Sequence, residues 1–414
     1  MLDINYIKKN FFFVIESLRF KKIKNIFFLI DNLFKIKKKI KNSKFVLDNF
    51  YRKIKKLSKN FKFLNNNKFK LKIFNIKLFI KKIEKLFQIY NKDLNFILDE
   101  LPNLSHYSLY LINNKSNILN KNGLILNINK KLLSHWNLCK KYNIVDFQLG
   151  NKLTKPGFPV YKEKGSQIQR ALVSFFLEEA KKKGYLEVQT PVIINKISAY
   201  GTGQLPDKED QMYSVDKNLY LIPTGEIPIT NLYRNIILKS ENLPIKSVGH
   251  TLCFRKEAGS WGKNVRGLNR LHQFDKVEIV QLQESKKSYK SLNLMLRYVE
   301  DLLKKLFLPY RILKLCIGDL GFCSSFTYDI EVFSSVQNKW LEVSSISNFE
   351  TYQSNRMKIK YKNSNNCINL LHTLNGSALA LPRILAALLE NNQAKYFIKV
   401  PKVLIPYTKF DKIF

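Results

Sequence analysis

Several features that would point to particular protein classes are missing from this chain of 414 residues. Its five cysteines include no Cys-x-x-Cys pair, and they share no zinc-ligand spacing with the five histidines, so we expect no structural zinc. The odd cysteine count and the absence of a signal peptide favour a reducing compartment, and we expect a cytoplasmic protein. The longest apolar runs, such as Phe11–Ile15 and Ile26–Ile30, are far too short to span a bilayer.

Acidic residues are also scarce relative to basic ones. The chain has 71 Lys and Arg against 32 Asp and Glu, which gives a formal net charge of +39 at pH 7. Residues 1–100 alone hold 26 basic and 8 acidic residues, a net charge of +18. Such an excess favours an anionic partner such as nucleic acid. The abundant Lys, Asn, Ile, Phe and Tyr all use A/T-rich codons, so we attribute part of the charge to mutational bias.

Two common nucleotide-binding motifs do not occur. The sequence has neither Gly-x-Gly-x-x-Gly after a strand pattern nor Gly-x-x-x-x-Gly-Lys-Ser/Thr, which argues against a parallel, Rossmann-type sheet. The length predicts two or three domains, and an apolar fraction of 45% is enough for a sizeable core.

A heptad pattern occupies most of the first quarter of the chain. Apolar residues recur at alternating spacings of three and four along Ile26–Leu64, with a gap at Ser43, and again along Ile73–Leu101. Asn65–Asn67 separate the two runs, and Pro102 ends the second. This predicts two long helices in an antiparallel hairpin. A helical bundle or a dimerisation coil would show the same pattern, and the lysines outside the seam either contact phosphate or keep the helices in solution.

The residue types best suited to chemistry gather in Phe254–Glu278, FRKEAGSWGKNVRGLNRLHQFDKVE. Arg255 and Glu257 are two apart, so on a strand they would point the same way, and alternation along His272–Glu278 predicts a second strand. Phe274 offers a flat apolar face for a base, and the final carboxylate suits an ammonium or a hydroxyl. An exposed basic hairpin without a ligand would look similar. Glycines and cations that would allow the intervening loop to close on a polyphosphate are Gly259, Gly262, Gly267, Lys263, Arg266 and Arg270.

This stretch resembles the second signature motif of class II aminoacyl-tRNA synthetases, in the form found in the seryl-tRNA synthetase family. Gly184–Pro191 (GYLEVQTP) resembles the first class II motif, which builds the dimer interface. Phe254–Glu278 and five other segments resemble the active-site segments of this family and come in the same order along the chain. Together they are specific enough to name serine as the amino acid. The other five are Tyr200–Pro206 (YGTGQLP), Leu221–Thr230 (LIPTGEIPIT), Tyr328–Val332 (YDIEV), Glu342–Asn348 (EVSSISN) and His372–Arg383 (HTLNGSALALPR), the last being the third class II motif.

The resemblance implies an α+β fold: an antiparallel sheet flanked by helices, with an N-terminal antiparallel coiled-coil hairpin. In this family the hairpin grips the long variable arm of tRNA(Ser), and the enzyme is a homodimer. We divide the chain into a tRNA-binding helical arm at residues 1–104, a connector at 105–150 and a catalytic domain at 151–414. Before a short extended tail, we predict helices at residues 165–183, 285–306 and 377–391.

The implied reaction has two steps and no clear need for a protein nucleophile. The serine carboxylate attacks the α-phosphorus of ATP, and the 3′-terminal ribose hydroxyl of tRNA then takes the seryl group. The predicted catalytic residues are Arg255, Glu278 and Arg383. The predicted serine ligands are Thr224, Gly225, Glu226, Glu278, Asn375 and Ser377. The predicted ATP-binding residues are Arg255, Lys256, Glu257, Phe274, Glu342, Val343, Ser344, Ser345 and Arg383, with Mg²⁺ on Glu342 and Ser345.

Three positions depart from the family pattern: Gly225 replaces Ala, Lys256 replaces a small polar residue, and Phe326 replaces Lys. Two alternatives to a serine–tRNA ligase remain open. A serine-activating carrier-protein ligase would lack the tRNA arm. A non-catalytic RNA-binding paralogue is expected to have lost one of the residues Arg255, Glu278, Glu342 or Arg383.

Overall fold

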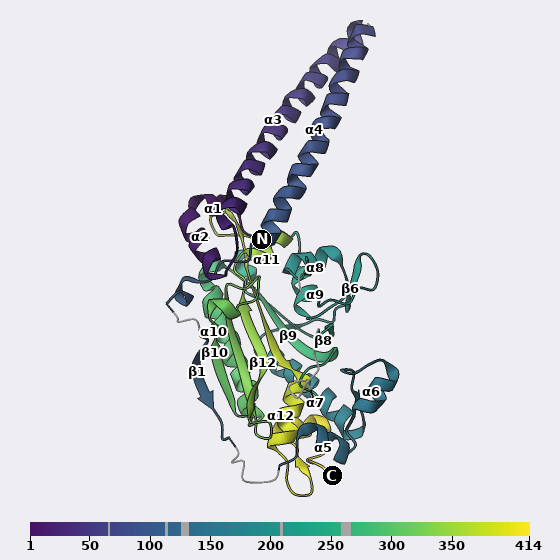
Figure 1. Cartoon of the computed structure of the whole chain (residues 1–414), viewed down its shortest axis with the longest axis vertical. Coiled ribbons are helices and arrows are strands. Elements are labelled where there is room, and N and C mark those ends of the chain that lie inside the picture. The colour runs from purple at the N-terminus through teal and green to yellow at the C-terminus, as the bar shows by residue number, and fades with distance from the viewer. Residues whose placement is uncertain (65–66, 112–114, 126–131, 208–209, 258–265) are drawn as a thin grey trace. The chain divides into compact units, whose positions relative to one another are not determined.

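The computed structural model describes residues 1–64, 67–111, 115–125, 132–207, 210–257 and 266–414, and their side chains except at 59–69 (Figure 1). It divides into two compact units, Met1–Pro102 and Asn103–Phe414. Some residues of interest lie outside the described part: Gly259, Gly262 and Lys263 of the predicted loop, and Asn65 and Asn66 of the predicted helix break.

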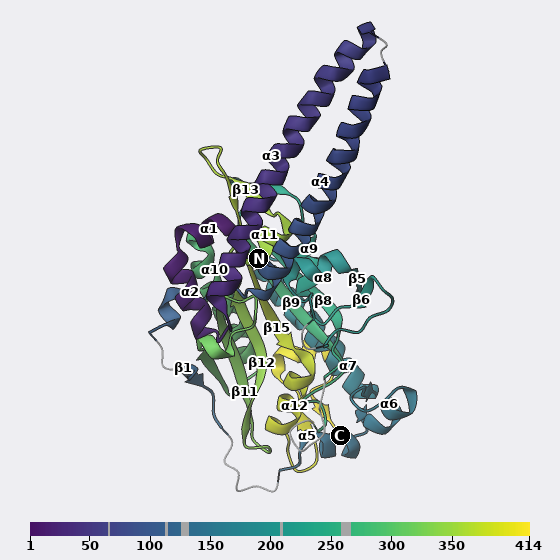
Figure 2. The same cartoon turned by 45° about the horizontal axis from the view of Figure 1, so that its top comes forward.

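The described residues of the first unit form helices joined by short turns. Two short helices, α1 (Ile4–Lys9) and α2 (Phe11–Phe20), precede α3 (Ile26–Leu64) and α4 (Asn67–Glu100). In all three whole-chain views α3 and α4 run side by side in opposite directions (Figure 2). Every predicted seam position with a described side chain is buried or partly buried, because the seams face each other. The predicted hairpin is confirmed, although α4 already begins at Asn67.

The second unit is built on an eight-stranded sheet, in the order β1-β10-β11-β12-β15-β9-β8-β4. Neighbouring strands are antiparallel except β4 with β8 at one edge, so the predicted antiparallel sheet is confirmed with one parallel pair added. The strands in sheet order are β1 (Asn117–Asn122), β10 (Tyr310–Lys314), β11 (Phe326–Ser334), β12 (Lys339–Asn348), β15 (His372–Ala380), β9 (Gln273–Gln283), β8 (Ile245–Phe254) and β4 (Leu186–Glu187).

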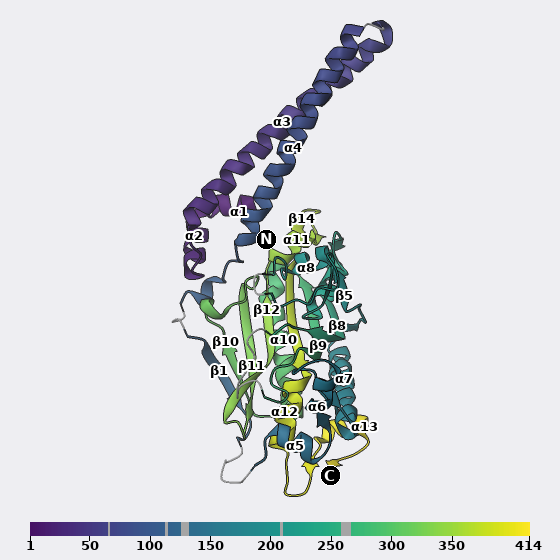
Figure 3. The same cartoon turned by 45° about the vertical axis from the view of Figure 1, so that its right-hand side comes forward.

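Three amphipathic helices pack against this sheet (Figure 3): α7 (Glu163–Lys182), α10 (Ser285–Lys305) and α12 (Leu381–Asn391). On α10 the buried side chains Leu292, Met295, Val299 and Leu302 recur every three or four residues, which forms one apolar face. Of the helices in the described part of the chain, none combines the length and the apolar composition that crossing a bilayer requires.

Shorter elements complete the unit. The helices are η1 (Tyr107–Leu109), α5 (His135–Lys141), α6 (Phe147–Leu153), α8 (Lys196–Thr202), α9 (Glu226–Asn231), η2 (Ser240–Asn242), η4 (Ile317–Asp319), α11 (Tyr352–Met357), η5 (Lys402–Leu404) and α13 (Ile405–Thr408). The strands are β2 (Val145–Asp146), β3 (Val160–Tyr161), β5 (Ile193–Asn195), β6 (Leu219–Leu221), β7 (Ile237–Lys239), β13 (Lys360–Lys362), β14 (Ile368–Leu370), β16 (Ile398–Lys399) and β17 (Lys412–Ile413).

Three local predictions are corrected. Strand β8 ends at Phe254, so Arg255 and Glu257 lie beyond it, and Glu257 has a φ of 36° instead of an extended conformation. Helix α12 begins only at Leu381, because Ser377 and Ala380 still pair with β9, and Pro382 lies in its first turn. The C-terminal tail is not merely extended, since it contains η5 and α13.

Candidate active site

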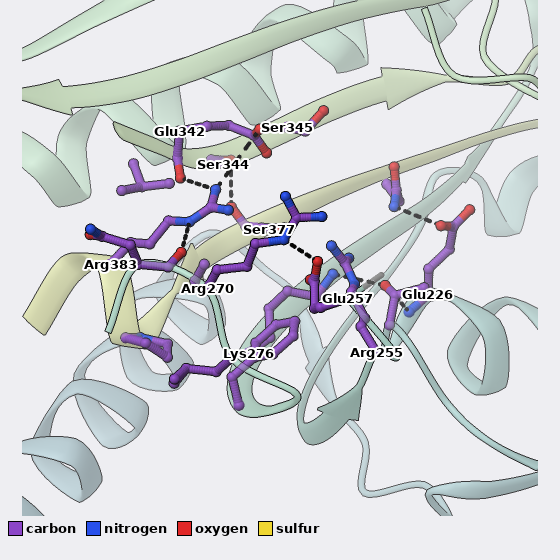
Figure 4. A pocket seen from close by; sticks show the side chains of 18 of the residues that line it. Glu226, Arg255, Glu257, Arg270, Lys276, Glu342, Ser344, Ser345, Ser377 and Arg383 are labelled. Atoms are coloured by element: carbon purple, nitrogen blue, oxygen red, sulfur yellow. Dashed lines mark hydrogen bonds and ion pairs between the residues drawn. The ribbon is translucent and has the colours of Figure 1, made fainter. Parts of the chain in front are cut away.

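Most predicted site residues line one cavity of about 320 Å³ in the second unit. Its walls come from the end of β8, from β9, β12 and β15, and from the start of α12. Figure 4 shows Arg383 and Glu342 at one end of this cavity, which we call the outer end. Glu226 lies at the opposite end, which we call the inner end. The predicted residues that line it are Thr224, Glu226, Arg255, Glu257, Phe274, Glu342, Val343, Ser344, Ser345, Asn375, Ser377 and Arg383.

A β-bulge in β12 brings two residues of opposite expected orientation to the same face. Glu331 of β11 pairs with Glu342 and Ile330 pairs with Ser344, so Val343 is an extra residue. In a regular strand, residues three apart point to opposite faces. The bulge resets this alternation, and both Glu342 and Ser345 therefore border the cavity.

A second bulge lies at the end of β15. Ser377 pairs with Glu278 and Ala380 with Lys276, so β15 has one more residue than β9 between these pairs. Leu379, within the bulge, is fully buried and has a φ of 96°, a strained conformation for a residue with a side chain. The bulge keeps both Ser377 and Ala380 on the cavity face just before α12 begins.

Glu278 lies directly behind the inner wall of the cavity and is 0% exposed. Thr224 Oγ1 donates to Glu278 Oε2 at 3.0 Å, and Asn375 Nδ2 lies 3.3 Å from Oε1. Lys276, two residues earlier on β9, forms an ion pair with Glu278 and donates to Thr224 Oγ1 at 2.8 Å. The buried carboxylate is therefore neutralised and fixed in orientation, as a buried charge requires.

A second carboxylate, Glu226, lies at the same end. Gln353 Nε2 donates to its Oε1 at 2.6 Å, and Asn375 Nδ2 donates to its Oε2 at 2.9 Å. Burial, with a smaller contribution from the Glu278 charge, raises the pKa of Glu226 to about 7, although the Gln353 hydrogen bond opposes the shift. Two neighbouring carboxyl groups thus differ in character: Glu278 is ion-paired, whereas Glu226 is held by neutral amides and has a raised pKa.

The rest of the cavity carries arginines and two further acids, of which Glu342 is half exposed and Glu257 is mostly buried. Arg383 Nη1 donates to the carbonyl oxygen of Glu342 at 2.6 Å and lies 3.9 Å from Glu342 Oε2. Arg270 forms an ion pair with Glu257. The Arg255 guanidinium lies 5.3 Å from the centre of the Phe274 ring, and its Nε donates to the carbonyl oxygen of Pro223 at 3.2 Å.

Glu342 and Ser345 supply oxygen donors on the same wall, the ligand type that Mg²⁺ prefers, so the donor chemistry fits that ion. Asp329, opposite Ser345 on β11, carries a second carboxyl group close to these donors. Burial and the nearby Glu342 charge raise the pKa of Asp329 to about 7, against a hydrogen bond from Ser345.

The predicted residues Gly225 and Lys256 are not among those that line the cavity. A Cβ atom on Gly225 would lie 3.0 Å from Thr251 Oγ1 and 3.3 Å from Glu278 Cβ, so the missing methyl would sit behind the inner wall. The Lys256 ammonium pairs with Asp210 at 2.6 Å. Phe326, the third departure, is buried, with the Lys314 ammonium 5.3 Å from its ring centre.

The residues that sequence reasoning did not assign to the site include Asn269 and Lys276, which line the cavity, and Gln353, which donates a hydrogen bond to Glu226. Lys276 was predictable, since it alternates with Phe274 and Glu278 along the predicted strand and must share their face. The Gln353 contact depends on a distant helix, and no sequence pattern indicates it.

Three comparisons relate the chain to known proteins. Residues 211–392 match the model of the tRNA synthetase class II core domain (G, H, P, S and T). A serine–tRNA ligase of Salinibacter ruber is 49% identical over 282 residues, which is 67% of this chain and 66% of that protein. One of Mycoplasma capricolum is 36% identical over 415 residues, 98% of each chain. The crystal structure of seryl-tRNA synthetase from Pyrococcus horikoshii complexed with ATP has a TM-score of 0.88 at 28% identity, covering 100% of this chain and 99% of that one.

Proposed function

The chain belongs to the serine–tRNA ligase family of class II aminoacyl-tRNA synthetases, and from this premise we propose how its own residues carry out the reaction. The enzyme activates serine with ATP and transfers the seryl group to tRNA(Ser). The observation that carries the assignment to individual residues is the buried, ion-paired carboxylate of Glu278 behind a cavity whose other end is lined by arginines.

At the inner end, Glu278 takes the ammonium or the hydroxyl of serine, together with Thr224, Glu226, Asn375 and Ser377. This is supported by the hydrogen bonds that fix Glu278 and Glu226 in place. A buried site that hydrogen-bonds a hydroxyl rejects alanine, because its polar groups would be left unpaired, while a close wall rejects the extra methyl of threonine.

Towards the outer end, Arg255 meets the α-phosphate of ATP and the serine carboxylate. Phe274 stacks on the adenine face, Glu257 contacts its edge, and Arg383 meets the γ-phosphate. Catalysis then consists of holding the serine carboxylate in line with the α-phosphorus and neutralising the charge that develops on the phosphates. This agrees with a cavity in which Arg255 and Arg383 both take part in the lining.

Glu342 and Ser345 would hold a Mg²⁺ ion, which would offset the negative charge of the phosphates. Val343 and Ser344 complete the same wall.

We also propose a homodimer in the cytoplasm. The dimer is supported by Leu186, which lies on the edge strand β4 in the segment resembling the first class II motif and is 64% exposed. The reducing location is supported by the thiols of Cys139 and Cys253.

The helical arm of the first unit would bind the tRNA, which its basic composition supports. Replacing residues 26–101 by a short linker tests this role against a carrier-protein ligase, which needs no arm, and against a non-catalytic paralogue. We expect the shortened enzyme to keep serine-dependent ATP–pyrophosphate exchange and to lose tRNA charging. The affinity of the intact enzyme for tRNA should fall with salt by a slope of about −0.7 to −0.9 per phosphate contacted, and the deletion should flatten this slope.

Three outcomes would contradict the proposal. Equal loss of exchange and charging would make the arm structural, full retention of charging would remove its role in tRNA binding, and no exchange in the intact chain would favour the paralogue.

A further inference from the structure

Helix α12 links the outer end of the cavity to a carboxylate that the reaction above does not use. Arg383 and Glu390 are seven residues apart on α12, so they lie on the same side, about 10 Å apart along the axis. Arg383 borders the cavity, whereas Glu390 is fully buried. Burial raises the pKa of Glu390, but hydrogen bonds, chiefly from His135, outweigh it and hold the pKa below its usual value. Glu390 is thus a buried carboxylate that accepts several hydrogen bonds.

One group that Glu390 holds is His135 on α5, also fully buried. His135 Nδ1 lies 2.7 Å from Glu390 Oε1, and the His135 backbone N–H donates to the same oxygen at 3.0 Å. On the other side of the ring, Nε2 accepts the backbone N–H of Leu268 at 2.9 Å. Nε2 can accept only if it carries no proton, so the imidazole is the Nδ1–H tautomer and donates to Glu390.

The contact between His135 and the turn before β9 leaves no spare room. The neighbouring Gly267 has a φ of 75°, and a Cβ atom there would lie 2.2 Å from His135 Nε2. Only glycine therefore allows the turn at 266–269 to approach the imidazole so closely.

A second path leads from Glu390 back to the cavity. Gln337, in the turn between β11 and β12, donates from Nε2 to Glu390 Oε1 at 3.2 Å. Its Oε1 accepts Asn269 Nδ2 at 2.8 Å, and the carbonyl oxygen of Asn269 accepts Arg383 Nε at 3.0 Å. Hydrogen bonds and helix α12 thus form a closed ring through Arg383, Asn269, Gln337 and Glu390.

We propose that His135, Gln337 and Glu390 are positioning residues for ATP. They fix the backbone of Leu268 and Asn269, and the Asn269 carbonyl in turn fixes the direction of the Arg383 guanidinium. Because Arg383 Nε is held by that carbonyl, the Nη atoms of Arg383 keep one orientation towards the phosphates. Residues that do not touch the substrate can in this way fix the position of a residue that does. The inference rests on the proposed role of Arg383 at the γ-phosphate.

A cluster that only joined α5 to α12 would affect the stability of the protein, and its loss would not change the KM for one substrate alone. The decisive variant is Gln337→Ala, because Gln337 is only partly buried and its loss removes a link without opening the core. We expect its KM for ATP in serine-dependent pyrophosphate exchange to rise roughly 3- to 10-fold, with the KM for serine unchanged. The matched control is Ser335→Ala in the same turn, which removes a partly buried hydrogen bond to Asn391 Oδ1 and should leave both KM values unchanged.

A pair of substitutions at His135 separates its two contacts. The amide of His135→Asn still reaches Glu390 but not Leu268, whereas His135→Gln is long enough to offer Leu268 an acceptor. We expect the KM for ATP to be higher in His135→Asn than in His135→Gln. Equal KM values for ATP in these two variants would overturn the role assigned to the Leu268 contact.

A double-mutant cycle tests the route through Arg383. In an Arg383→Ala background, Gln337→Ala should no longer change the KM for ATP, because the group that it positions is gone. The inference is overturned if Gln337→Ala leaves the KM for ATP unchanged in the wild-type background, if it raises both KM values together, or if the two effects simply add. If Arg383→Ala itself leaves the KM for ATP unchanged, the proposed role of Arg383 fails first, and the two failures are therefore distinguishable.

Discussion

The two ends of the cavity hold their charges in different ways. At the inner end, Glu278 and Lys276 are buried and joined through Thr224, so their positions are fixed by hydrogen bonds. At the outer end, the side chains of Arg383 and Glu342 are 32% and 51% exposed and their charged atoms are 3.9 Å apart. Buried polar groups discriminate strongly because leaving one unpaired is costly, while exposed charges are screened by water. The inner end is therefore suited to selecting a small amino acid, and the outer end to attracting phosphates.

Removing the inner carboxylate should have the largest effect. We expect Glu278→Ala to lower serine-dependent pyrophosphate exchange by roughly 10²–10³-fold, the usual effect of losing one preorganised group, while ATP binding stays largely intact. Exchange kinetics and ATP titration measure the two quantities. Glu331→Ala is a matched control, because Glu331 pairs with Arg311 and does not line the cavity. Near wild-type exchange in Glu278→Ala would contradict the assignment of the inner end.

The protonation of Glu226 predicts a pH-dependent stability. Its folded-state pKa of about 7 exceeds the ordinary 4.5, so the folded protein binds the extra proton and loses stability as pH rises from about 4.5 to 7. Glu226→Gln cannot ionise. Its free energy of unfolding relative to wild type should therefore increase by about 3 kcal/mol between pH 4 and pH 8. Denaturant unfolding at both pH values measures this, and a difference that does not change with pH would show that Glu226 ionises normally.

At the outer end, we expect Arg383→Ala to raise the KM for ATP roughly 10- to 150-fold, the range for a lost charge-assisted hydrogen bond of about 1.5–3 kcal/mol. The KM for serine should not change, because the inner end keeps its contacts. Arg311→Ala, which removes a guanidinium from an ion pair that does not line the cavity, is the control. A rise in both KM values would remove the distinction between the two ends.

The smallest effect is expected at Lys256. Its partner Asp210 is largely exposed, and exposed ion pairs contribute about 0–1 kcal/mol. Lys256→Ser should therefore change the KM for ATP by less than about 5-fold. A change as large as that of Arg383→Ala would return Lys256 to the ATP site.

The sequence predicted the parts of the molecule that depend on local pattern. The heptad spacing along Ile26–Leu64 and Ile73–Leu101 sufficed for the hairpin, because seam residues must face each other whatever else the chain does. The order of the motifs sufficed for the family and for most residues that line the cavity. Lys276 needed only the two-residue period of β9.

Features that depend on tertiary pairing were not predictable. The bulges at Val343 and Leu379 exist only in relation to the strands beside them, and a single sequence contains no sign of either. Arg255 was expected on a strand, but β8 ends one residue earlier. His135, in a segment that resembles no motif, meets Glu390 some 255 residues away in the chain.

The most direct test of the central claim is ATP–pyrophosphate exchange by the intact protein with serine, alanine and threonine in parallel. A buried site that hydrogen-bonds the serine hydroxyl predicts exchange with serine, a kcat/KM for alanine lower by about 10⁴ or more, and exclusion of threonine by the inner wall. Comparable kcat/KM values for serine and alanine, or exchange that does not depend on serine, would contradict the account.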